Sequence, residues 1–126
     1  MKLIKAVDNP NFGTLPDFGN INPGDDNAEV IRKTVPYANG ISVKTAWQAD
    51  GTHPWWDLEK IIRICQDSGY HGFWGIESSC GWKGERPSPG QARRRESLSA
   101  EQIWENELKG VQLTKAVLER LVLKKG

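Results

Sequence analysis

The chain has 126 residues, of which 37% are hydrophobic and 26% are charged, values typical of one soluble globular domain. The 17 Lys and Arg residues nearly balance the 16 Asp and Glu residues. The net charge of +1 therefore does not indicate binding to nucleic acid or to a membrane surface. Apolar runs are far shorter than the roughly 20 residues that span a bilayer. The N-terminus has no apolar core of signal-peptide length before Asp8. We therefore expect a cytoplasmic protein with no nucleic-acid or membrane partner.

The first half of the chain predicts a strand, a helix and a second strand. Residues 12–18 are expected to form the first strand, which ends in a Gly-Asn turn. Asp25 or Asp26 can cap a helix over residues 28–35, because an aspartate oxygen accepts the free N–H groups of a first helical turn. Residues 40–45 alternate β-branched side chains, which is typical of a strand.

The second half repeats this pattern. Asp57 is placed to cap a helix whose apolar side chains recur at helical spacing, namely Leu58, Ile61, Ile62 and Cys65. Residues 72–77 are almost all apolar or glycine, the pattern of a strand buried on both faces of a parallel sheet. Ser99 and Gln102 form a capping box for a final helix of about 20 residues, with Trp104 at a core position. Strand starts about 30 residues apart predict three successive parallel β/α units.

Polar side chains stand where the expected strands end. The first strand ends at Asp17 and Asn20, the second at Lys44 and the third at Glu77. Chemistry in parallel β/α folds is found at the carboxyl ends of the strands. Two carboxylates there suit a divalent cation, an asparagine suits a sugar hydroxyl, and a lysine suits a phosphate or a developing oxyanion.

Each of these residues also has a simpler interpretation. Asp17 before a Gly-Asn pair is ordinary turn chemistry, and Glu77 and Lys44 are also compatible with charges at strand ends. His53 lies in a loop, where histidine is commonly polar surface. Cys65 on an apolar helical stripe indicates a small buried side chain, and Cys80 follows the third strand in a turn.

Three stretches together resemble the C-terminal part of the sugar phosphate isomerase/epimerase family, the xylose-isomerase-like TIM barrels. They are GTLPDFGN (residues 13–20), ISVKT (41–45) and DSGYHGFWGIES (67–78). The resemblance implies that Asp17 and Glu77 bind a divalent metal ion (Mn, Mg or Zn) and that Glu77 also transfers a proton. It implies substrate contacts for Asn20 and Lys44, and we add His53 as a further substrate-binding candidate. Ser42 departs from the family, in which many members carry a metal-binding histidine at this position.

The implied fold is a partial (β/α)8 TIM barrel, a single domain over residues 1–126 with about three β/α units, the last three strands and a long C-terminal helix. A complete barrel needs about 250 residues. We therefore expect association into a homo-oligomer or with an N-terminal half-barrel partner. The implied function is metal-assisted isomerisation or epimerisation of a small sugar or sugar phosphate. The alternative is a non-catalytic truncated fragment or oligomeric assembly module, and the sequence leaves enzymatic activity open.

Overall fold

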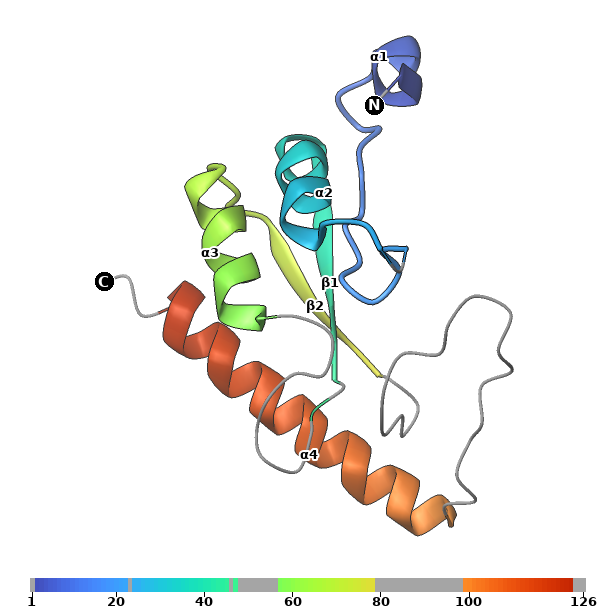
Figure 1. Ribbon diagram of the computed structural model, residues 1–126, viewed down its shortest axis with the longest axis vertical. Coiled ribbons are helices and arrows are strands. Elements are labelled where there is room, and N and C mark those ends of the chain that lie inside the picture. Colours follow the sequence, from blue (N-terminus) through green and yellow to red (C-terminus); the bar gives the residue numbers. More distant parts are fainter. Residues whose placement is uncertain (1, 23, 46, 48–56, 79–98, 124–126) are drawn as a thin grey trace.

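The computed structural model describes residues 2–22, 24–45, 47, 57–78 and 99–123. Within these ranges the chain forms four α-helices and one small parallel sheet (Figure 1). The elements in chain order are α1 (Lys2–Val7), α2 (Asn27–Thr34), the 3₁₀ turn η1 (Val35–Tyr37), β1 (Gly40–Lys44), α3 (Leu58–Asp67), β2 (Phe73–Glu77), α4 (Ala100–Leu118) and the π-helical turn η2 (Glu119–Leu123). None of the helices in these ranges has the length and apolar character needed to cross a membrane.

The sheet has two strands in the described part of the chain, so the prediction of three strands, three β/α units and a partial TIM barrel is wrong. β1 and β2 pair in parallel, with Gly40 opposite Phe73 and Lys44 opposite Glu77. Residues 12–18 do not form a continuous strand. Their pairing with the rest of the chain consists of two isolated parallel β-bridges, Thr14 with Ala38 and Asp17 with Ser42.

The irregular course of residues 12–18 has a physical cause. The pairing offset changes from 24 residues at Thr14–Ala38 to 25 at Asp17–Ser42, so one register cannot continue. Pro16 between the bridges has no N–H to donate to a ladder. Its carbonyl nevertheless accepts the Ser42 N–H at 2.9 Å, and this segment therefore runs beside β1 without becoming a regular strand.

The helix ends confirm the capping predictions. Asp26 accepts the N–H groups of residues 28 and 29 at the start of α2. Asp57 accepts the N–H of residue 60 at the start of α3, and Gly69 follows that helix with φ of 78°, a conformation that glycine adopts readily. Ser99 and Gln102 form the reciprocal capping box of α4. α1 was not predicted, and none of its residues is buried.

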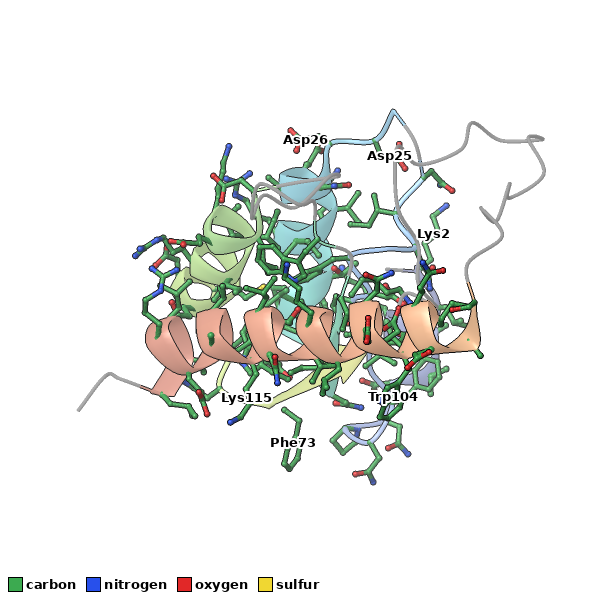
Figure 2. The ribbon with its side chains drawn as sticks, turned by 90° about the horizontal axis from the view of Figure 1, so that it is seen from below. Lys2, Asp25, Asp26, Phe73, Trp104 and Lys115 are labelled. Atoms are coloured by element: carbon green, nitrogen blue, oxygen red, sulfur yellow. The ribbon has the colours of Figure 1, made fainter. Side chains whose placement is uncertain are left out.

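The core lies on one face of the sheet. Ile41 and Val43 of β1 are buried in the cluster that contains Ile31, Ile62 and Leu118, and their register partners in β2 pack against this cluster. The other face of the sheet is covered at Ser42, which is 6% exposed, and open at the start of β2. Phe73 is 84% exposed there and points away from α2 and α3 (Figure 2), so the prediction that this strand is buried on both faces is wrong.

α4 packs across the carboxyl end of β1. Gly110 is buried against Thr45, where a Cβ at position 110 would lie 2.4 Å from the Thr45 carbonyl oxygen. The Thr45 hydroxyl lies 2.8 Å from Glu107 of α4, and the Trp47 indole N–H donates to Thr114 at 2.9 Å. The N-terminal half of α4 is less enclosed: Trp104 is 69% exposed, which corrects its predicted core position.

Candidate functional site

The Lys44 ammonium lies between two carboxylates at the carboxyl end of the sheet. Its Nζ is 3.2 Å from Oδ2 of Asp17 and also forms an ion pair and hydrogen bond with Oε1 of Glu77. The side chains of Lys44 and Asp17 are each 13% exposed, whereas that of Glu77 is 50% exposed. Three neighbouring parallel segments thus bring their charged ends to one point.

A tight turn after the first segment fixes the Asp17 carboxylate. Oδ1 accepts the Gly19 N–H at 2.8 Å, and Oδ2 accepts the Asn20 side-chain amide at 2.7 Å. Asp17 therefore stabilises the turn, as its simpler interpretation predicted, and the same carboxylate also contacts Lys44 at the end of the segment. Asn20 is brought to the cluster by its bond to Asp17, and its own side chain is exposed.

Ser42 is the member of the cluster that sequence reasoning did not assign to the site. It is 6% exposed, and its hydroxyl donates to Oε2 of Glu77 at 2.5 Å. A signal was present, because side chains two residues apart on a strand share a face, which puts Ser42 beside Lys44. Ser42 is opposite Gly75 in the register of the sheet, and Glu77 lies two residues further along β2 on the same face.

The cluster changes the proton affinities of two of its members. Burial alone would lower the pKa of Lys44, but its hydrogen bonds to Glu77 and Asp17 and their negative charges outweigh burial, so the pKa is raised. The Lys44 and Ser42 hydrogen bonds lower the pKa of Glu77. At neutral pH the cluster therefore contains an ammonium ion and a Glu77 carboxylate.

The geometry does not fit a divalent metal bound by Asp17 and Glu77. Lys44 occupies the space between them, and their oxygens already accept hydrogen bonds from Lys44, Ser42 and the 19–20 turn. Across the described ranges, no group of three or more His, Cys, Asp or Glu residues is placed to hold a metal ion. The metal predicted from the resemblance stays a prediction.

His53 and Cys80 lie outside the described residues, so the structure does not place these two candidates. Cys65 is buried in the core, as its position on the helical stripe predicted. Burial raises the pKa of its thiol to about 12, which makes it a structural side chain without nucleophilic character at neutral pH.

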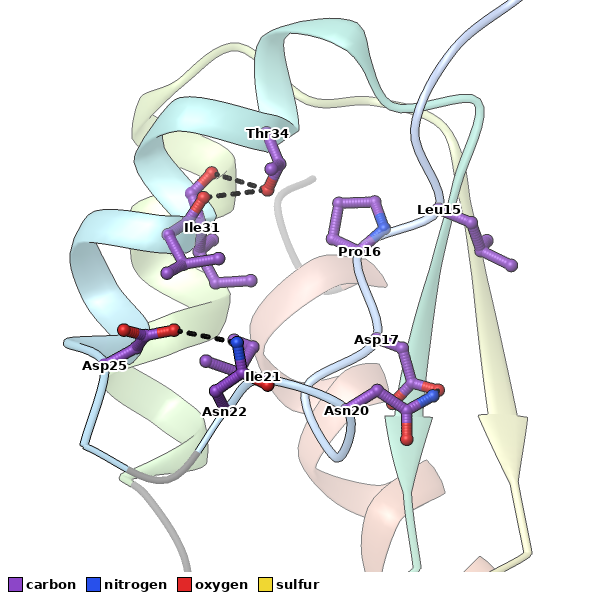
Figure 3. Close-up of a pocket in the computed structure, with 10 residues that line it drawn as sticks. Leu15, Pro16, Asp17, Asn20, Ile21, Asn22, Asp25, Ile31 and Thr34 are labelled. Carbon is purple, nitrogen blue, oxygen red and sulfur yellow. Dashed lines mark hydrogen bonds between the residues drawn. The ribbon is translucent and has the colours of Figure 1, made fainter. Parts of the chain in front are cut away.

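A pocket of about 330 Å³ adjoins the cluster on its α2 side. Its lining includes Asp17, Asn20, Ile21, Asp25 and Ile31. Figure 3 shows the side chains of Asp17 and Asn20 beside β1, whereas that of Asp25 lies by α2. Asp17 and Asn20 belong to both the pocket lining and the cluster, whereas Ser42, Lys44 and Glu77 do not line this pocket.

A comparison with protein-family models finds no match for this chain, and a comparison with curated proteins finds none. The resemblance of residues 13–20, 41–45 and 67–78 to sugar phosphate isomerases and epimerases therefore stays an expectation. The chemistry of the site is argued below from its side-chain geometry.

Proposed function

We propose that the Asp17–Lys44–Glu77 cluster binds a small sugar or sugar phosphate and transfers a proton next to its carbonyl group, as an isomerase or epimerase does. The observation that carries the proposal is that one ammonium group contacts two carboxylates on neighbouring parallel segments. The cytoplasmic location expected from the sequence belongs to the same proposal.

The cluster contains both hydrogen-bond donors and hydrogen-bond acceptors, which supports a sugar as its ligand. A sugar hydroxyl both donates and accepts, so a sugar needs acceptors and donors side by side. Asp17 and Glu77 supply carboxylate acceptors, and Lys44 and Asn20 supply donors with charge or amide character. Phosphate of a sugar phosphate would be drawn to the same ammonium.

The proton-transfer step uses Glu77 and Lys44. The Glu77 carboxylate removes a proton from the carbon next to the carbonyl, and the electron pair of that C–H bond forms the C=C bond of an enediolate. The Lys44 ammonium stabilises the negative oxygen. Glu77 returns the proton to the neighbouring carbon while a hydroxyl proton moves between the two oxygens, so the isomerisation needs no oxidant or reductant.

Ligand binding also makes Glu77 a better base in this proposal. In the free protein the hydrogen bonds from Lys44 and Ser42 hold its pKa low, and a low pKa makes a weak general base. A ligand oxygen that takes the Lys44 hydrogen bond frees Oε1 of Glu77 and raises its proton affinity. Because half of the Glu77 side chain is exposed, it can reach a ligand above the sheet.

The test is hydrogen exchange of candidate sugars in D₂O. The protein is incubated with aldoses, ketoses and their phosphates, and ¹H NMR follows deuterium entering the carbon next to the carbonyl. We expect exchange with wild type, its loss in Glu77→Gln and Lys44→Met, and unchanged exchange in Lys33→Met. Lys33 is a matched control because it forms an exposed helical pair with Glu29 away from the cluster. Absence of exchange and of ligand-induced shifts with every sugar would contradict the proposal.

An assembly module is the second candidate, and the open face of the sheet favours it. Leu15 and Phe73 are 68% and 84% exposed, and both lie beside Gly40, which pairs with Phe73 in the sheet. Large apolar side chains gathered on one face are typical of surfaces that associate. Under this alternative, light scattering detects a self-associated species that Phe73→Asp dissociates, and no sugar undergoes exchange.

A further inference from the structure

The two carboxylates of the cluster present oxygens to a single cation. Oδ2 of Asp17 and Oε1 of Glu77 contact the same Lys44 nitrogen. A divalent ion held by two carboxylates takes the same central position, at the shorter oxygen distances of about 2.0–2.6 Å. An ammonium and a metal ion therefore cannot both occupy it.

All four carboxylate oxygens are already engaged. On Asp17, Oδ1 accepts from the Gly19 N–H, and Oδ2 accepts from Asn20 in addition to its contact with Lys44. On Glu77, Oε1 contacts Lys44 and Oε2 accepts from Ser42. Ser42 and Asn20 both act as donors to these oxygens, which orients the carboxylates around the lysine.

Lys44 is also held in place along its length. Its aliphatic chain passes directly over Gly19, where a Cβ would lie 2.6 Å from both Cγ and Cε. Only 13% of the side chain is exposed. A metal ion entering the cluster would have to expel the ammonium from two opposite charges, because a second cation beside it would be repelled.

We propose that Lys44 serves as the built-in cation of this site and that the native cluster is metal-independent. This inference goes beyond the proposed function and does not require turnover of any sugar. It replaces the metal expected from the resemblance with a side chain of the protein itself. A corollary is that removing the ammonium leaves two adjacent carboxylates that attract a divalent ion.

Titration with Mn²⁺ tests the proposal, with the loss of the electron paramagnetic resonance signal of free Mn²⁺ as readout. Wild type is expected to show no saturable uptake below about 1 mM, a range in which carboxylate-built sites bind divalent ions. Lys44→Met retains the length of chain over Gly19 without the charge and is expected to gain one site. Adding Asp17→Asn to Lys44→Met is expected to remove it, and Lys33→Met is expected to behave as wild type.

Two results would overturn the inference. The first is saturable Mn²⁺ uptake by wild type that Asp17→Asn abolishes, since the metal would then displace Lys44. The second is a folded Lys44→Met chain that takes up no Mn²⁺. Circular dichroism checks folding, and Lys44→Gln is a second neutral variant. If both Lys44 variants unfold, the comparison of Mn²⁺ uptake by wild type and by Asp17→Asn still tests the inference. A chain that exchanges no sugar but shows the expected Mn²⁺ pattern contradicts the proposed function alone.

Discussion

Gly19 lies directly against the aliphatic chain of Lys44. A Cβ at position 19 would approach Cγ and Cε of the lysine to 2.6 Å, closer than carbon atoms pack. The glycine thus lets a side chain of β1 cross the turn and reach Asp17. The contact between Gly19 of the turn and Lys44 of β1 therefore keeps the ammonium beside Asp17.

Gly19→Ala is therefore expected to displace Lys44 and destabilise the protein by about 1–3 kcal/mol, the usual cost of overpacking. Urea unfolding measures this loss. Gly75→Ala is the matched control, because its Cβ would meet only the Ile41 carbonyl oxygen at 3.5 Å, an ordinary contact. Equal stability of the two variants would show that the contact between Gly19 and Lys44 is unimportant.

The lowered pKa of Glu77 predicts acid sensitivity. A carboxyl whose folded-state pKa lies below its ordinary value of 4.5 stabilises the fold above that pH. This contribution declines as pH falls below about 4.5 and is lost once the pH passes the folded-state pKa. Urea unfolding between pH 6 and pH 3 is expected to show a smaller decline in Glu77→Gln than in wild type. The effect is modest because half of the side chain is exposed, and identical slopes would contradict it.

Lys44 predicts the opposite behaviour in alkali. Its pKa is raised above the ordinary value of 10.5, so its contribution is complete below that pH and is lost as the pH rises through the folded-state pKa. Unfolding free energies measured from pH 9 to pH 12 are expected to fall less steeply in Lys44→Met than in wild type. Lys33→Met, which lacks an exposed lysine, is expected to follow wild type. A Lys44→Met curve parallel to wild type over this range would contradict the prediction.

Short-range signals predicted α2, α3 and α4, and also the ends of β1 and β2, but not α1. Asp26, Asp57 and Ser99 each cap a helix as expected, because capping depends on neighbours within three residues. The meeting of Asp17 and Lys44 followed from the rule that parallel segments end at one edge. These parts of the fold and site could be predicted from the sequence.

Longer-range features could not be predicted in the same way. Residues 12–18 have the composition of a strand. The change of register around Pro16 that interrupts the strand exists only in the pairing with β1, which local sequence does not reveal. The bond from Ser42 to Glu77 depends on the pairing of β1 with β2. Trp104 occupies a helical position that suits a core, but in the structure 69% of it is exposed. Each of these outcomes is set by packing between segments far apart in the chain.

Gly110→Ala tests the crossing of α4 over β1. In an exposed helix this change would stabilise by about 1 kcal/mol. Here the added Cβ would lie 2.4 Å from the Thr45 carbonyl oxygen and 2.9 Å from its Cβ, so α4 has to move away. We expect net destabilisation of up to about 2 kcal/mol after the helical gain is subtracted from the overpacking cost. Gln112→Ala, at an exposed position of the same helix, is the control and should be neutral or stabilising. A stabilised Gly110→Ala would show that α4 does not pack here.

Cys65 offers a probe of the core that is independent of the site. Its side chain is fully buried and its thiol has a pKa of about 12, so the reactive thiolate is scarce and inaccessible in the folded protein. In a Cys80→Ser chain, which leaves a single thiol, a disulfide reagent is expected to react only when the chain unfolds. The modification rate should then rise along the urea unfolding curve measured by circular dichroism. Rapid reaction in the absence of urea would mean that α3 opens locally without global unfolding.

Ile62 and Val43 are likewise fully buried in this core. Truncating either to alanine is therefore expected to increase the rate by destabilising the whole fold.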